Sequence, residues 1–207
     1  MNKRIISGLL VSAGFSERMG QFKPLMHYNG KSFVVTIAEK LSEVCNRVVI
    51  VTGFQDEKIE EEINSQFSSV SGGFSSQLLE RIKCAYNPNF VQGMFSSLQA
   101  GLKELKNSDW ILYHFVDQPF HEEKFYNELV AQIDDNYDWV QPCYEGKEGH
   151  PVLFSKNIFK DIINSSPNSS LKKIKEENNV KIKRWECIYS AILKDFDYQE
   201  DIKKFLA

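Results

Sequence analysis

The sequence has no apolar stretch long enough to cross a bilayer and no strong excess of either charge. Its formal net charge is -3, and acidic and basic residues are interspersed along its 207 residues. Such a surface attracts neither nucleic acid nor an anionic membrane over long range, so we expect neither as a partner. The basic start of the chain leads into an apolar run that Ser7, Gly8, Ser12 and Gly14 interrupt. That pattern favours a buried first strand over an export signal.

Cysteine is also scarce, and its spacing excludes two kinds of site. Cys45, Cys84, Cys143 and Cys187 form neither a CxxC pair nor the clustered spacing of a zinc site or a disulfide framework. We therefore expect reduced, buried thiols in a cytoplasmic protein. The sequence shows no internal repeat and no Ser-His-Asp or Cys-His arrangement, so nothing indicates a nucleophilic side chain.

What the sequence does contain is enough apolar material for one α/β domain over residues 1–207, since 42% of its residues are hydrophobic. The apolar runs Ile5–Val11, Val48–Val51 and Trp110–Val116 lack the alternation of a half-solvated sheet. They predict parallel strands buried on both faces. Helical patterns lie between these runs, with Ser32 as the cap of the first, so the prediction is a doubly wound sheet.

Weaker patterns predict further elements. Apolar spacing predicts one helix over Gln55–Ile63 and another that begins at Ser96. The serine- and glycine-rich tract Ser68–Gln77 predicts an exposed loop. Short strands are expected at Trp139–Pro142 and Pro151–Phe154, and helices around Ile158–Ile163, Leu171–Asn178 and Gln199–Leu206.

The loop after the first predicted strand is rich in groups that bind phosphate. Gly14 and Gly20 allow the backbone to approach a polyanion, while Arg18 offers a planar fork and Lys23 a compact charge. The spacing matches neither a Walker loop, since no Ser or Thr follows Lys23, nor the dinucleotide fingerprint. A glycine-rich turn with a solvated arginine and lysine explains this loop alone equally well.

Asp117 follows the third predicted strand, and Thr52-Gly53 follows the second. Ligands of open α/β sheets bind beyond the carboxyl ends of the strands, so we expect both features near the Gly14 loop. Asp117 ends a wholly apolar run and suits Mg²⁺, which takes one or two protein carboxylates and completes its shell with waters and phosphates. An aspartate that caps the next helix is the alternative.

A third feature is the segment that precedes the helix expected at Ser96. Gly93 gives the backbone freedom there, and Ser96 and Ser97 lie in the predicted first turn. Either serine can cap the helix and leave N–H groups for a ligand, although such capping is ordinary in itself.

These stretches together resemble the MobA-like nucleotidyltransferase family, and most closely its molybdenum cofactor cytidylyltransferase branch. The resemblance spans nearly the whole chain, with the motifs in the expected order. The matching residues are Ser12 to Gly20, Lys23-Pro24-Leu25, Val51-Thr52-Gly53, Asn87-Pro88, Gly93 to Leu102, Asp117-Gln118-Pro119 and Gly149-His150-Pro151.

The resemblance implies a Rossmann-like three-layer α/β/α fold with a mostly parallel central sheet. It also implies a Mg²⁺-dependent transfer of a nucleotidyl group from a nucleoside triphosphate, with release of pyrophosphate. Residues up to 118 would form the nucleotide-binding half of the single domain, and residues 119–207 the acceptor-binding half. By analogy the nucleotide-binding residues are Ala13, Gly14, Ser16, Arg18, Lys23, Thr52, Gly53, Ser96 and Ser97, and the catalytic residues are Arg18, Lys23 and Asp117.

The same analogy assigns residues of the acceptor-binding half. Asp195 to Asp201 resembles the acidic DxDxxED motif of this branch, so Asp197 is a candidate second Mg²⁺ ligand beside Asp117. An N-cap of the last helix is the equal alternative for Asp197. His150 is the candidate contact with the acceptor, and a packed hydrogen-bonding histidine is its alternative.

Ser165–Lys172 departs from the family pattern, because this segment lacks the glycines and the acid of the GDxGxR-like stretch, and Ser12 replaces the usual alanine. The leading hypothesis is transfer of CMP from CTP to a molybdopterin-type acceptor, with a molybdenum hydroxylase apo-enzyme as the recipient of the product. A second hypothesis changes the nucleotide to GTP or the acceptor to a sugar phosphate. A third is a maturation chaperone that binds the finished cofactor without catalysis. The presence of Arg18, Lys23 and Asp117 disfavours it, because a carrier of the product has less need to bind a triphosphate and a metal.

Overall fold

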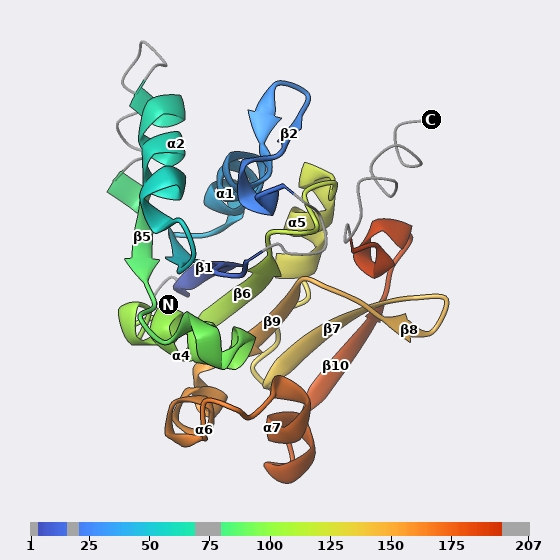
Figure 1. Ribbon diagram of the computed structural model, residues 1–207. Helices are drawn as coiled ribbons and strands as arrows, with labels where there is room; N and C mark the ends of the chain where they lie inside the picture. Colours follow the sequence, from blue (N-terminus) through green and yellow to red (C-terminus); the bar gives the residue numbers. More distant parts are fainter. Residues whose placement is uncertain (1–3, 16–20, 69–79, 196–207) are drawn as a thin grey trace.

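The computed structural model describes residues 4–15, 21–68 and 80–195 as three layers around one sheet (Figure 1). The strands follow one another in the spatial order β10-β7-β9-β6-β1-β4-β5, and β8 pairs with β7. The strands are β1 (Ile6–Ser12), β4 (Arg47–Thr52), β5 (Ile82–Tyr86), β6 (Trp110–Phe115), β7 (Trp139–Tyr144), β8 (Lys147–Glu148), β9 (Val152–Ser155) and β10 (Ile182–Glu186). Two short strands, β2 (His27–Tyr28) and β3 (Lys31–Ser32), form a separate hairpin.

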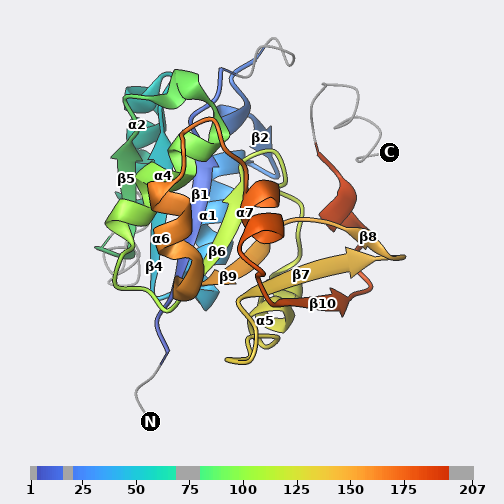
Figure 2. The same ribbon diagram turned by 90° about the horizontal axis from the view of Figure 1, so that it is seen from below.

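Helices cover both faces of this sheet. One face carries α1 (Phe33–Val44), α2 (Asp56–Ser68) and α5 (Glu123–Val130), and the other carries α4 (Met94–Glu104), α6 (Phe159–Asn164) and α7 (Leu171–Glu177). Figure 2 views the sheet from the side of α4, α6 and α7. Single helical turns lie at η2 (Lys23–Leu25), η3 (Phe90–Gln92), η4 (Lys156–Ile158) and η5 (Ser190–Leu193). The predicted α/β fold with a mostly parallel sheet is confirmed.

The three apolar runs form neighbouring parallel strands at the centre of the sheet. β1 pairs in parallel with β4 on one side and with β6 on the other. Successive residues of a strand point to opposite faces, so Leu10 packs under α1 while Leu9 packs against α4. Because helices cover both faces, both sets of side chains are apolar, and the strands read as continuous hydrophobic runs.

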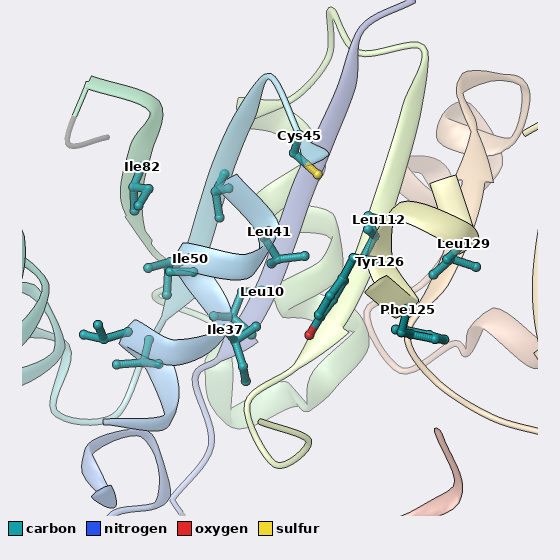
Figure 3. Close-up of a cluster of buried hydrophobic side chains, with 14 of the residues drawn as sticks. Leu10, Ile37, Leu41, Cys45, Ile50, Ile82, Leu112, Phe125, Tyr126 and Leu129 are labelled. Atoms are coloured by element: carbon teal, nitrogen blue, oxygen red, sulfur yellow. The ribbon is translucent and has the colours of Figure 1, made fainter. Parts of the chain in front are cut away.

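Figure 3 shows part of the core on the α1 side, where Leu10 and Ile37 lie between β1 and α1. Phe125 and Tyr126 of α5 extend this cluster toward the far half of the sheet. α1 begins where the sequence places it, because the Ser32 Oγ accepts a hydrogen bond from the Val35 N–H at 3.4 Å.

Several elements differ from the sequence prediction. α4 begins at Met94 rather than Ser96, with Gly93 as its N-cap at φ 99°, so neither Ser96 nor Ser97 caps it. Glycine tolerates this positive φ, whereas side-chain-bearing residues rarely adopt it. β9 pairs antiparallel with both β6 and β7, which makes the sheet mixed. The loop expected at Ser68–Gln77 and the helix expected at Gln199–Leu206 lie outside the described residues, apart from Ser68 at the end of α2.

The four cysteines are free thiols, as their spacing predicts, and Cys45, Cys143 and Cys187 are buried as expected, whereas Cys84 is only partly buried. Burial raises the pKa of the Cys45 and Cys84 thiols to about 12, so both stay protonated near neutral pH. Within the described residues, no helix combines the length and the apolar character that crossing a membrane requires.

Two buried histidines lie between β6 and α5. The His114 Nε2 lies 2.9 Å from the Tyr126 hydroxyl, and its Nδ1 lies 2.7 Å from the Phe115 carbonyl oxygen. His121 stacks on Phe125 with the ring centroids 4.8 Å apart. Burial lowers the pKa of His114 to about 3 and lowers the pKa of His121 well below its usual value, so both are neutral at neutral pH.

We expect these histidines to make the fold sensitive to acid. In the unfolded chain they take up protons near pH 6.5, whereas in the folded chain they remain neutral to a much lower pH. The free energy of unfolding is therefore at its full value above pH 6.5 and falls as the pH drops below it. Thermal unfolding of the wild type and of His121→Phe across this range checks it. The variant should show the shallower pH dependence, and equal slopes would contradict the assignment to His121.

Candidate active site

The carboxyl ends of β1 and β6 and the start of α4 enclose a cavity of about 500 Å³. Parallel strands end at the same edge of the sheet, which is why residues far apart in the sequence meet there. The polar groups that line it come from four segments of the chain. The lining includes Ser12, Ala13, Gly14, Lys23, Gly93, Ser97 and Asp117. The structure thus brings together five of the predicted site residues: Ala13, Gly14, Lys23, Ser97 and Asp117.

Lys23 and Asp117 are the charged pair of this cavity. The Lys23 Nζ lies 3.7 Å from the Asp117 Oδ2. Lys23 lies on η2, which has a proline in its first turn, and the residue is only 9% exposed. The Asp117 side chain is more open, at 28% exposure. The cavity therefore presents a fixed ammonium group and an accessible carboxylate side by side.

In the described part of the chain, the loop after β1 contributes main-chain groups to the lining of the cavity and no charged side chain. Ala13 and Gly14 line the cavity, and the Ala13 carbonyl accepts a hydrogen bond from the Phe54 N–H at 3.2 Å. Gly14 has open space around the position of a Cβ, so a ligand can approach the main chain closely there. Ser16 and Arg18, which the sequence adds to this site, lie outside the described residues.

Thr52 and Gly53 lie behind the cavity wall rather than on it. Thr52 is fully buried, and its carbonyl accepts a hydrogen bond from the Asn87 N–H at 2.9 Å. A Cβ on Gly53 would stand 2.6 Å from the Phe90 ring and 2.8 Å from the Ala13 carbonyl. These two residues therefore support the wall of the cavity by close packing. Their contact with a nucleoside stays a prediction.

Ser96 and Ser97 are held by Asn87. The Asn87 side-chain amide donates to the Ser96 Oγ at 2.9 Å and to the Ser97 Oγ at 3.1 Å. The Ser96 hydroxyl in turn donates to the Gly93 carbonyl at 2.7 Å. Ser97 lines the cavity and Ser96 does not. The serines thus tie the start of α4 to Asn87 instead of capping the helix.

The oxygen donors of the cavity fit a hard divalent ion. Asp117 is the carboxylate of its lining, and the described residues contain no cluster of three or more metal-ligating side chains. A dedicated protein cage is therefore absent from that part of the chain, whereas Mg²⁺ needs few protein ligands when substrate phosphates complete its shell. Asp197, the predicted second ligand, lies outside the described residues.

A second cavity, of about 390 Å³, adjoins the first. Gly93, Met94 and Phe115 line both cavities. His150 lines the second cavity and packs on Phe115, with the ring centroids 4.8 Å apart. Burial lowers the pKa of His150 to about 4, against the opposing effect of the Asp195 carboxylate, so the imidazole is neutral at neutral pH. Residues 167–171, within the segment that departs from the family pattern, also line this cavity.

Sequence reasoning missed an aromatic group at the mouth of the first cavity. The Phe15 ring packs on Phe54 and Phe90, with centroid separations of 5.2 and 5.3 Å, and remains 43% exposed. Its position within a glycine-rich loop was the available signal, since a large exposed aromatic residue is unusual in such a loop. A side-chain contact was missed as well, in which the Gln118 Nε2 donates to the Asp195 Oδ1 at 2.7 Å.

A family model agrees with this architecture. The model for the MobA-like NTP transferase domain matches residues 8–182, which includes both cavities and most of the described chain. The chain belongs to this family. It is a nucleotidyltransferase enzyme by membership, and members of the family generally use a divalent metal.

Two related proteins are similar over most of the chain. The molybdenum cofactor cytidylyltransferase of Escherichia coli K12 is 24% identical over 151 residues, which are 73% of this chain and 70% of the relative. A probable molybdenum cofactor guanylyltransferase of Bacillus cytotoxicus is 23% identical over 157 residues, 74% of this chain and 70% of the relative.

Solved structures share the fold. A nucleotidyl transferase from Methanothermobacter thermautotroptrophicus superposes with a TM-score of 0.76 at 18% identity, covering 98% of this chain and 96% of that one. A manganese complex from Mycobacterium tuberculosis H37Rv superposes with a TM-score of 0.72 at 15% identity, covering 98% of each chain. At these identities the likeness shows the fold.

Proposed function

We propose that the protein transfers CMP from CTP to a phosphorylated molybdopterin-type acceptor and releases pyrophosphate. The observation that carries the proposal is the pairing of the Lys23 ammonium and the Asp117 carboxylate, 3.7 Å apart, in a cavity at the carboxyl edge of the sheet. A triphosphate needs a cation that contacts its oxygens and a carboxylate that holds its metal ion. The similarity to a cytidylyltransferase of molybdenum cofactor supports this choice of nucleotide and acceptor.

In the proposed reaction, a phosphate oxygen of the acceptor attacks the α-phosphorus in line. The new bond joins this oxygen to the α-phosphorus, and the bond to the β-phosphate oxygen breaks as pyrophosphate leaves. Lys23 stabilises the negative charge that develops on the leaving oxygens, together with Arg18 in the proposed set. Bound Mg²⁺, held by Asp117 with Asp197 as the proposed second ligand, would neutralise further charge on the triphosphate.

The two adjoining cavities support a division of labour between the halves of the domain. We assign the nucleotide to the first cavity and to the half up to residue 118, with Ala13, Gly14 and Ser16 at the phosphates. The acceptor is assigned to the second cavity, where the neutral His150 ring and residues 167–171 line the wall. A molybdenum hydroxylase apo-enzyme is the proposed recipient of the product, as the family resemblance implies.

The proposal is tested by incubating the purified protein with Mg²⁺, molybdopterin and each nucleoside triphosphate in turn. We expect pyrophosphate release that requires both substrates and is fastest with CTP, together with a product whose mass equals the acceptor plus CMP. If pyrophosphate release is faster with GTP than with CTP, the nucleotide substrate is GTP. If a sugar phosphate supports pyrophosphate release, the acceptor is a sugar phosphate. If no reaction releases pyrophosphate but the protein binds the finished dinucleotide tightly, catalysis is rejected. The hypothesis of a maturation chaperone would then be supported.

A further inference from the structure

Lys40 is a half-buried lysine of α1 with an unusual set of partners. Its ammonium group donates to two main-chain carbonyl oxygens, that of Pro119 at 2.9 Å and that of His121 at 2.7 Å. Lys31 and Lys83, in contrast, donate to surface carboxylates. Lys40 therefore joins α1 to the backbone of the segment after β6, whereas Lys31 and Lys83 join side chains.

Burial makes this arrangement costly. It lowers the pKa of Lys40, since a charged group loses hydration on leaving water, while Glu123 and Glu39 act in the opposite direction. Hydrogen bonds from an ammonium group to carbonyl oxygens are charge-assisted and stronger than neutral ones. The two carbonyls thus compensate Lys40 for its lost hydration, and Lys40 in turn fixes the position of both carbonyls.

The segment that Lys40 holds begins at the candidate metal ligand. Pro119 and His121 lie two and four residues after Asp117. Within this stretch the Phe120 ring packs edge-on against Tyr28, with the centroids 4.5 Å apart. Residues 117–121 are thus clamped from the side of α1 by charge and from the side of the small hairpin by an aromatic contact. Asp117 is the first residue of this segment, so its side chain is attached to the backbone that leads into these contacts.

We propose that Lys40 is a positioning residue that holds residues 117–121, and with them the Asp117 carboxylate, in the orientation that receives the metal–triphosphate complex. The inference rests on the proposed function. Lys40 lies on the helix and not among the residues that line either cavity, so it acts through the backbone of this segment. Its loss should therefore weaken metal-dependent binding of the nucleotide without removing any group that touches it.

The first test measures how firmly Lys40 holds residues 117–121, and it does not depend on enzyme activity. Lys40→Met keeps the length of the side chain and removes its hydrogen-bond donors, Lys40→Arg keeps donors, and Lys124→Met, at an exposed lysine of α5, is the matched control. By hydrogen exchange and mass spectrometry, we expect amides of residues 116–122 to exchange about tenfold faster in Lys40→Met, as loss of charge-assisted hydrogen bonds predicts. Lys40→Arg and Lys124→Met should exchange like the wild type.

The second test measures the consequence for the site. Calorimetric titration with the Mn²⁺ complex of α,β-methylene CTP should show about tenfold weaker binding to Lys40→Met, with binding restored in Lys40→Arg. If Lys40 acts through Asp117, the two substitutions are not additive, so Lys40→Met should weaken binding much less in an Asp117→Asn background. In turnover, kcat should fall while the KM for the acceptor stays unchanged.

Unchanged exchange at residues 116–122 in Lys40→Met would overturn the inference, and so would faster exchange over the whole chain with a lower Tm, which marks a general loss of stability. Full additivity with Asp117→Asn would overturn it as well. If the wild type neither binds the nucleotide complex nor releases pyrophosphate, the proposed function fails, and the exchange result still decides whether Lys40 holds the segment.

Discussion

Replacing Asp117 with asparagine is expected to lower kcat for pyrophosphate release by about 10³-fold. Asparagine has nearly the same shape, so the change removes the negative charge that holds the metal ion and leaves the packing at the end of β6 intact. The Asp117 side chain is 28% exposed beside the cavity, so the amide of the variant keeps partial contact with water. A steady-state pyrophosphate assay over a series of Mg²⁺ concentrations measures the effect, and the half-saturating concentration should rise.

The control for this prediction is Asp135→Asn, which removes a carboxylate from an exposed ion pair with Arg4. This variant should keep wild-type activity, because exposed pairs contribute little and Asp135 is not among the residues that line the cavity. Thermal unfolding of both variants shows whether the fold is retained. A folded Asp117→Asn variant with wild-type kcat and Mg²⁺ dependence would refute the assignment of Asp117 as the metal ligand.

Replacing Lys23 with methionine is expected to lower kcat by about 10²-fold and to raise the KM for the nucleotide. Methionine fills the buried space of the lysine stem, since Lys23 is 9% exposed, but cannot donate to phosphate oxygens. The loss falls mainly on kcat because charge on the triphosphate increases as pyrophosphate leaves. Initial rates at varied nucleotide concentration separate the two parameters.

Lys58→Met is the matched control for this change, since Lys58 is an exposed lysine on α2. It should keep wild-type kcat and KM. The double variant Lys23→Met with Asp117→Asn should lose less activity than the product of the two single losses, because the two groups lie 3.7 Å apart and act on the same triphosphate. If the Lys23→Met variant keeps wild-type kcat and KM for the nucleotide, Lys23 does not contact the triphosphate.

The strands that are buried on both faces could be predicted from the sequence, because such burial requires apolar residues. β1, β4 and β6 are covered by helices on both faces, so their sequences are almost entirely apolar and are easily recognised. β5 and β10 lie at the two edges of the sheet and carry charged side chains such as Lys83 and Arg184, so no apolar run marks them. α5 was missed too, although its buried Phe125 and Leu129 have helical spacing.

In the candidate site as well, some residues could be predicted from the sequence and others could not. Ala13, Gly14, Lys23 and Asp117 follow or adjoin the central strands, and the common direction of those strands brings them to one cavity. The role of Ser96 depends on its hydrogen bond with Asn87, nine positions earlier, and no local pattern indicates that contact. Gly53 is predicted to bind nucleotide from its place in the sequence, and the structure adds a packing requirement at this position, because the Phe90 ring lies against it.

The sequence by itself determined the α/β class, the central strands and the chemical types at their ends, because hydrophobic periodicity and loop composition are local properties of a chain. Only the tertiary structure decided which of their side chains contact one another. It placed Lys23 beside Asp117, turned β9 antiparallel so that His150 faces a second cavity, and set Lys40 of α1 against the backbone that follows Asp117. These contacts join residues separated by up to about a hundred positions, and no local pattern encodes a distance across a sheet.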